Sequence, residues 1–231
     1  MSPTARRPVI ALDGPAGAGK STVARRVAAA LGYVLVDTGA LYRAVALACA
    51  RAGVSWDDPD GVGAQAEALV ARGAIALVPA PDGLRVELDR ADVTREIRSP
   101  ENSLGASRVS AVPRVRAALL EMQRASLRGG GAVMEGRDIG TVVAPDAEVK
   151  LFVTASPEVR ARRRHDELVA RGERPSYEDT LRDVLARDRA DESRAIAPLV
   201  PAADAEVLDT SSMSLDEVVD AIVARARAAG G

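Results

Sequence analysis

The residues with the clearest chemistry lie in a glycine-rich run near the start of the chain. The run reads Gly14-Pro15-Ala16-Gly17-Ala18-Gly19-Lys20-Ser21, with Thr22 next, and it fits the pattern G-x-x-x-x-G-K-[ST]. Glycines allow a turn whose backbone N–H groups face phosphate oxygens, and the helix that follows adds its positive N-terminal end. Lys20 offers a positive charge for the β- and γ-phosphates, and Ser21 offers a hydroxyl for Mg²⁺. The run predicts a P-loop that binds a nucleoside triphosphate, without defining the reaction.

A second group of charged residues indicates an anionic acceptor. Only two of the 31 basic residues are lysines, Lys20 and Lys150, so the P-loop lysine stands out in a chain that otherwise uses arginine. Arg43 lies just after the second apolar run, and Arg137 and Asp138 follow the third. The guanidinium fork matches two phosphate oxygens, and ligands of open α/β sheets bind at the carboxyl ends of strands. These positions favour a kinase of a small anionic molecule.

The elements that must position these residues alternate along the chain. Short apolar runs at 9–12, 34–36, 132–134, 149–153 and 207–208 are typical of buried strands. Amphipathic stretches lie between them, and the stripe of Val23, Val27 and Leu31 is followed by Gly32 as a C-cap signal. Helix-start signals occur in Ser156-Pro157-Glu158 and Ser214-Leu215-Asp216-Glu217. The alternation predicts a parallel sheet of about five strands with helices on both faces.

One region departs from this alternation. Residues 73–78 and 84–88 have the pattern of two strands joined by Pro79-Ala80-Pro81-Asp82-Gly83. A hairpin of this kind within an α/β chain predicts an inserted antiparallel subdomain over about 60–110. At 231 residues and 47% hydrophobic content, we expect a single domain over 1–231 that carries this insert.

The composition excludes several classes of protein. The single cysteine, Cys49, rules out a disulfide within the chain, and with the single histidine, His165, it supplies too few ligands for a Cys/His zinc site. The net charge of −2 and the aromatic content of 2% argue against nucleic acid or a membrane surface as partner. No apolar run reaches the length of a membrane span or a signal-peptide core. We expect a cytoplasmic protein in which Cys49 is buried.

Five segments together make the chain resemble bacterial cytidylate kinase over nearly its whole length. They are the P-loop, Asp37-Thr38-Gly39-Ala40-Leu41-Tyr42-Arg43, Pro113-Arg114-Val115-Arg116, Gly136-Arg137-Asp138-Ile139-Gly140-Thr141-Val142-Val143 and Arg194-Ala195-Ile196-Ala197-Pro198-Leu199. The last two are specific to this family among nucleoside monophosphate kinases. The resemblance implies a three-layer P-loop kinase fold with an inserted subdomain and a helical lid. It also implies transfer of the γ-phosphoryl group of ATP to CMP and dCMP, with Mg²⁺.

The resemblance also implies a role for each site residue. The ATP side comprises Gly14 to Thr22, and the acceptor monophosphate is held by Thr38 and Arg43. Ser107 and Arg116 are implied at the cytosine and the CMP side, Arg137 at the phosphates, and Asp138 at the cytosine or its neighbouring groups. Asp191 is implied at the sugar hydroxyls, and Arg187 and Arg194 at the phosphates. The catalytic set is therefore Lys20, Arg137, Arg187 and Arg194.

Some of these residues also fit purely structural roles. Arg114 and Arg116 also fit one solvated helix face, and Asp138 also fits a helix cap or a partner of Arg137. Asp191 lies in a run of acids and bases where i,i+4 pairs are expected anyway, so pattern alone does not single it out.

The predicted lid spans about 157–175 and carries many arginines. Most of them fit a solvated face, but Arg160 and Arg164 share a face at i,i+4 spacing and are candidates for contact with ATP. A lid that closes only over both substrates excludes water, so we expect slow ATP hydrolysis without CMP.

Two other functions remain open from the sequence. The first is a kinase of another acceptor, such as AMP, dTMP or a metabolite like shikimate. The second is a nucleotide-binding regulator that hydrolyses slowly or not at all. A GTPase is disfavoured because Asn102, the only asparagine, is followed by Ser103 and so forms no N-K-x-D segment. No apolar heptad indicates obligate assembly, so we expect a monomer.

Overall fold

The computed structural model describes residues 7–80, 83–170, 172–194 and 196–230. The chain divides into two compact units, one formed by the chain up to Tyr33 and from Gly129 onward, the other by Val34–Arg128. Among the described residues, no helix is both long enough and apolar enough to cross a membrane. The expected single domain with an insert over 60–110 stays a prediction, and each unit is described by itself below.

The first unit is built on parallel strands. β1 (Val9–Asp13) pairs with β6 (Ala132–Glu135) on one side and β7 (Val149–Thr154) on the other, and β8 (Glu206–Asp209) pairs with β7. The strand order of the five-stranded sheet is β2-β6-β1-β7-β8, and its edge strand β2 (Val34–Asp37) is the first segment of the second unit. All five strands lie at the apolar runs that predicted them. The side chains of Ile10, Leu12 and Leu151 are fully or almost fully buried and form part of the core.

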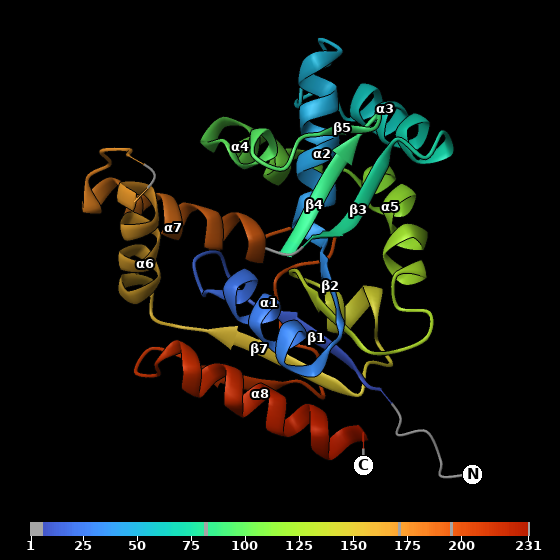
Figure 1. The fold of residues 1–231 in the computed structure, drawn as a ribbon. Coiled ribbons are helices and arrows are strands. Elements are labelled where there is room, and N and C mark those ends of the chain that lie inside the picture. The colour runs from blue at the N-terminus through green and yellow to red at the C-terminus, as the bar shows by residue number, and fades with distance from the viewer. Residues whose placement is uncertain (1–6, 81–82, 171, 195, 231) are drawn as a thin grey trace. The chain divides into compact units, whose positions relative to one another are not determined.

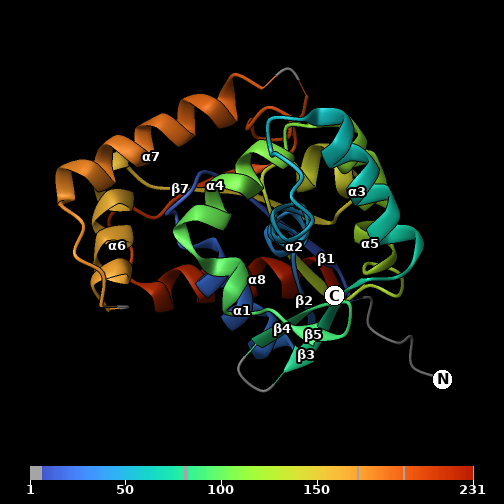
Figure 2. The same cartoon turned by 90° about the horizontal axis from the view of Figure 1, so that it is seen from above.

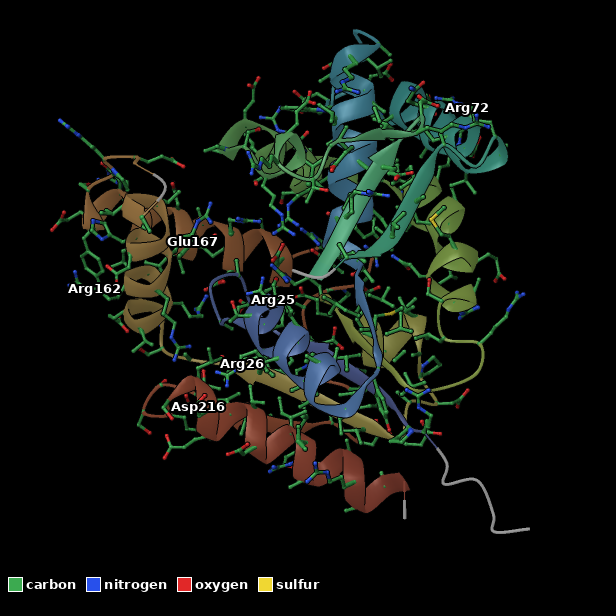
Figure 3. All side chains as sticks on the ribbon, viewed as in Figure 1. Arg25, Arg26, Arg72, Arg162, Glu167 and Asp216 are labelled. Atoms are coloured by element: carbon green, nitrogen blue, oxygen red, sulfur yellow. The ribbon has the colours of Figure 1, made fainter. Side chains whose placement is uncertain are left out.

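Two helices of the first unit pack against this sheet and against each other (Figure 1). α1 (Lys20–Leu31) ends at Gly32, whose left-handed conformation and N–H bonds to the last turn form the predicted C-cap. α8 (Leu215–Gly230) begins with the predicted capping box, since the backbone N–H of Ser214 donates to Glu217 at 2.8 Å and Glu217 N–H donates to Ser214 Oγ at 3.3 Å. Arg26 of α1 and Asp216 of α8 form an ion pair at 2.6 Å and lie close together in Figure 3.

Two further helices of the first unit lie side by side in both ribbon views (Figures 1 and 2). α6 (Pro157–Ala170) begins at the predicted signal, with Ser156 Oγ accepting from Val159 N–H at 3.3 Å. α7 (Tyr177–Glu192) follows, and the guanidinium of Arg162 lies 4.4 Å from the ring centre of Tyr177. A short π-helical turn, η2 (Ile139–Val143), comes directly after the Arg137–Asp138 pair. π-helical turns are rare in proteins, and many of those that occur lie at functional sites.

The second unit combines an antiparallel sheet with helices. The sheet order is β3-β4-β5, formed by Ile75–Ala80, Gly83–Leu88 and Ala91–Asp92, and the helices are α2 (Thr38–Arg51), α3 (Pro59–Ala71), α4 (Pro100–Val109) and α5 (Pro113–Ala125), with a short turn η1 (Glu96–Arg98). The predicted hairpin is confirmed by the pairing of β3 with β4. Pro81 and Asp82 of its predicted turn lie outside the described residues. The core of this unit includes Leu41, Leu69 and Leu119, and Cys49 is buried as predicted.

Candidate active site

The glycine-rich run forms a tight loop between β1 and α1. Gly14, Gly17 and Gly19 have backbone φ values of 142°, 77° and 85°, which residues other than glycine rarely adopt. A Cβ at Gly14 would lie 2.0 Å from the carbonyl oxygen of Val153, so the neighbouring strand β7 passes directly against the loop. α1 begins at Lys20, which places its first turn, including Ser21 and Thr22, at the end of the loop. This is the strand–loop–helix geometry that binds phosphate at a helix N-terminus.

Lys20 is turned into the loop that it terminates. Its Nζ donates to the carbonyl oxygens of Gly14 and Pro15, each at 2.7 Å, and its side chain is buried. Burial lowers the pKa of Lys20 well below its usual value, and the nearby positive charge of Arg137 lowers the pKa further. Glu135 and Asp13 oppose this shift because their charges favour the ammonium form. A bound phosphate would do the same, so the site is electrostatically suited to an anion.

Asp191 of α7 holds two of the predicted phosphate-binding arginines. Its Oδ2 accepts from Arg137 Nε at 3.0 Å, and its Oδ1 accepts from Arg194. Although burial acts to raise the pKa of Asp191, the charges of Arg137 and Arg194 outweigh it, and the pKa lies below its usual value. Arg187 of the same helix contributes in the same direction. The resemblance implied these four residues for one site, and the structure gathers the three arginines around the Asp191 carboxylate.

Arg160 is engaged within the protein. Its guanidinium forms a bidentate pair with Asp188 of α7, at 2.9 and 2.6 Å, and also donates to the carbonyl oxygens of Ala155 at 2.9 Å and Ala16 at 3.1 Å. The backbone of α6 follows the loop closely, since a Cβ at Gly17 would lie 3.0 Å from the carbonyl oxygen of Arg160. Arg160 thereby links the P-loop with α7. The contact with ATP expected for Arg160 or Arg164 stays a prediction.

The acceptor-side residues of the second unit gather around the start of α2. Asp37 caps this helix by accepting from Ala40 N–H at 3.0 Å, and Thr38 is its first residue and is buried. The carbonyl oxygen of Arg43 accepts from the side-chain amide of Asn102 on α4 at 3.0 Å. Sequence reasoning missed this role of Asn102, because an asparagine one turn into a helix gives no signal of a partner 59 residues away.

Ser107 and Arg116 are linked to each other and to α2. Ser110 Oγ donates to the carbonyl oxygen of Ser107 at 2.9 Å, and the carbonyl oxygen of Ser110 accepts from Arg116 at 3.2 Å. The Arg116 guanidinium lies 5.6 Å from the ring centre of Tyr42 on α2. Arg114, two residues away, instead pairs at the surface with Glu67 at 2.7 Å. The two arginines therefore do not share one solvated face.

The predicted site residues thus form one group in each unit. The first unit holds the P-loop with Lys20, Ser21 and Thr22, and also Arg137, Asp138, Arg187, Asp191 and Arg194. The second unit holds Thr38, Arg43, Ser107 and Arg116. Asp138 is buried directly before η2. Over the described residues, no cluster of three or more histidine, cysteine or acidic side chains is placed to hold a metal ion. A Mg²⁺ ion bound with a nucleotide needs few protein ligands, and the exposed hydroxyl of Ser21 fits that requirement.

The fold and the loop define a class of protein before any relative is considered. A parallel sheet, a glycine loop after its first strand, a helix beginning at the loop lysine and arginines organised around a carboxylate together describe a P-loop kinase. The chain belongs to the cytidylate kinase family, because the model of that family matches residues 10–228. The resemblance read from the motifs is therefore confirmed.

Curated relatives support the same membership. A cytidylate kinase of Pelotomaculum thermopropionicum is 55% identical over 96% of this chain and 96% of its own length. A cytidylate kinase of Geobacter sp. is 50% identical over 92% of this chain and 89% of its own. A solved structure of an uncharacterized protein from Eubacterium ventriosum is 10% identical, covers 96% of this chain and 99% of its own, and has a TM-score of 0.52, which shows the likeness of the fold alone.

Proposed function

We propose that this protein transfers the γ-phosphoryl group of ATP to CMP, and also to dCMP, giving ADP and the nucleoside diphosphate. The observation that carries the proposal is the family match over residues 10–228, in a chain whose P-loop has the required geometry. The same match disfavours the two alternative functions, a kinase of another acceptor and a nucleotide-binding regulator.

The reaction asks little acid–base chemistry of the protein. The acceptor is a phosphate whose second pKa is about 6, so it is largely dianionic near neutral pH and needs no general base. The difficulty is the approach of two anions, which fixed cations reduce. Lys20, Arg137, Arg187 and Arg194 would supply these cations, and Asp191 holds Arg137 and Arg194 in place. Mg²⁺, held with the phosphates by Ser21, would add further positive charge to the transferring group.

The residues of the second unit would bind the acceptor. Thr38 and Arg43 are proposed at the monophosphate, Ser107 and Arg116 at the cytosine side, with Asp138 of the first unit at the cytosine or its neighbouring groups. The engagement of Arg116 with Tyr42 and Ser110 supports its role, because it fixes the guanidinium on the α2 side of the helix. Asp191 is also proposed at the sugar hydroxyls, each of its oxygens having lone-pair capacity beyond one arginine bond.

An acceptor panel tests the reaction. ADP release would be followed with ATP and Mg²⁺ and with CMP, dCMP, UMP, AMP or dTMP in turn. We expect strong stimulation by CMP and dCMP, loss of that stimulation in Lys20→Met, and retention in Lys150→Met. Lys150 is the matched control because it is the only other lysine in the sequence and its ammonium pairs with Asp204. Stimulation by AMP or dTMP would reject the cytidylate assignment, and equal rates with and without CMP would reject the lid.

A pair of neighbouring arginines tests the acceptor side. We expect Arg116→Ala to raise the KM for CMP at least tenfold with little change in the KM for ATP. Arg114→Ala serves as the control, since its partner is the surface carboxylate of Glu67. Equal effects of the two substitutions would refute the role of Arg116.

We further propose a cytoplasmic monomer, which sizing by light scattering and cell fractionation would test.

A further inference from the structure

Asp13 is a buried carboxylate that the proposed reaction does not use. It is the last residue of β1, directly before the P-loop, and only 4% of its surface is exposed. Both carboxylate oxygens are engaged by backbone groups 126 and 127 residues further along the chain. Oδ1 accepts from Ile139 N–H at 2.8 Å, and Oδ2 accepts from Gly140 N–H at 2.7 Å. A carboxylate that binds two successive N–H groups forms a strong and directional anchor.

These two N–H groups belong to the start of η2. The first N–H groups of a helical turn have no partner within the turn, and the residue before η2, Asp138, makes no side-chain cap. Asp13 therefore caps η2 from another strand. The position also places a negative charge at the positive end of the turn, which is the favourable arrangement.

The same strand anchors the segment on its other side. Gly136 N–H donates to the carbonyl oxygen of Leu12 at 3.0 Å. Arg137 and Asp138 are thus the only two residues between one anchor on Leu12 and two anchors on Asp13. Arg137 in turn reaches Asp191 through Nε at 3.0 Å and its own Gly136 carbonyl oxygen through a terminal nitrogen at 3.1 Å. The direction in which the Arg137 side chain leaves the backbone follows from these anchors.

We propose that Asp13 is a positioning residue for phosphoryl transfer, which holds the Arg137–Asp138 segment in register with the start of the P-loop. The assignment rests on the phosphate-binding role proposed for Arg137. The charge on Asp13 is essential to it, because a neutral amide of the same size would present a donor to one of the two N–H groups. Burial raises the pKa of Asp13 above its usual value, and the bonds from Gly140 and Ile139 offset part of that rise, so these two N–H groups favour the ionised form of the buried carboxyl.

The test is a cycle between Asp13→Asn and Arg137→Ala, with Glu148→Gln as the matched control. Glu148 also accepts from a β1 backbone group, Val9 N–H at 2.9 Å, but at the opposite end of the strand. We expect Asp13→Asn to lower the kcat for CMP phosphorylation at least tenfold, to change the KM for ATP less than threefold, and to add less than threefold loss when Arg137 is already alanine. Glu148→Gln should keep the parental kcat.

The outcomes separate the inference from the function on which it rests. A full additional loss in the Arg137→Ala background, or a loss confined to the KM for ATP, would overturn the positioning role. A normal kcat for Arg137→Ala would remove the role of Arg137 and the inference with it, while activity with CMP would still uphold the kinase. If Asp13→Asn does not fold, Asp13→Glu replaces it in the cycle, because the longer side chain keeps the charge but shifts the carboxylate relative to the Ile139 and Gly140 N–H groups. We then expect a loss of about threefold in kcat that vanishes with Arg137→Ala, and an unchanged or fully additive effect would refute the proposal.

Discussion

Replacing Asp188 by alanine should destabilise the protein far more than removing one partner of an exposed ion pair does. Asp188 accepts two hydrogen bonds from Arg160, and the two side chains are only 13% and 5% exposed. Removing one partner of a buried pair costs about 3–5 kcal/mol, because the other charge is left without its counterion. Arg160 would keep its bonds to Ala155 and Ala16, so we expect the lower end, about 3 kcal/mol.

Thermal unfolding followed by circular dichroism measures this loss. For a chain of this length, 3 kcal/mol corresponds to a fall of about 6–12 °C in Tm. The control is Glu206→Ala, which removes an equally bidentate partner from Arg225, but with side chains 52% and 34% exposed. Exposed pairs are worth about 0–1 kcal/mol, so the control should lose no more than about 4 °C.

A double variant completes the argument. Arg160→Met combined with Asp188→Leu removes both charges, and the apolar side chains fill similar space, so it should be less destabilised than Asp188→Ala alone. Equal shifts for Asp188→Ala and Glu206→Ala would refute the reasoning, because burial would then not decide the value of the pair. A double variant that loses the sum of its two single substitutions would refute it as well.

Three further outcomes follow from other parts of the structure. Because burial lowers the pKa of Lys20 and bound phosphate would raise it, ATP binding should take up protons, and ATP affinity should fall as pH rises through the pKa that Lys20 has in the free protein. Calorimetry in buffers of different ionisation enthalpy measures this proton uptake. Lys20→Arg should flatten the dependence of ATP affinity on pH. Gly14→Ala should abolish folding or lower Tm steeply because its Cβ meets the Val153 carbonyl oxygen at 2.0 Å, whereas Gly32→Ala has open space and should cost only the strain of its positive φ, about 1 kcal/mol, as unfolding curves would show. Burial raises the pKa of Cys49 to about 11, so a thiol reagent at pH 8 should label the native protein far more slowly than the urea-unfolded chain, and comparable rates would contradict its burial.

Much of the fold was accessible from the sequence because its signals are local. Apolar runs placed all five strands of the parallel sheet, and capping patterns placed the starts of α6 and α8 and the end of α1. The P-loop was equally clear, since the loop, its lysine and the helix that follows lie within a few residues of one another. Its glycines have the positive φ values that the pattern requires.

The individual uses of the charged residues were decided by the tertiary structure. The run from Arg160 to Arg164 contains four arginines that are alike in sequence, and only the packing of α6 against Gly17 engages Arg160 with Ala16 and Asp188. Arg114 and Arg116 lie two positions apart, yet the first meets a surface carboxylate and the second meets Tyr42.

Asp13 shows the same division most clearly. As the last residue of an apolar strand it has no periodic or motif signal of its own, and the N–H groups that it binds lie 126 and 127 residues away. The sequence by itself determined the strands, the helix caps, the phosphate-binding loop and the family, because each depends on residues adjacent along the chain or on a motif. Only the tertiary structure decided which carboxylate holds which arginine or backbone group, because hydrogen bonds between distant segments depend on how the strands and helices pack.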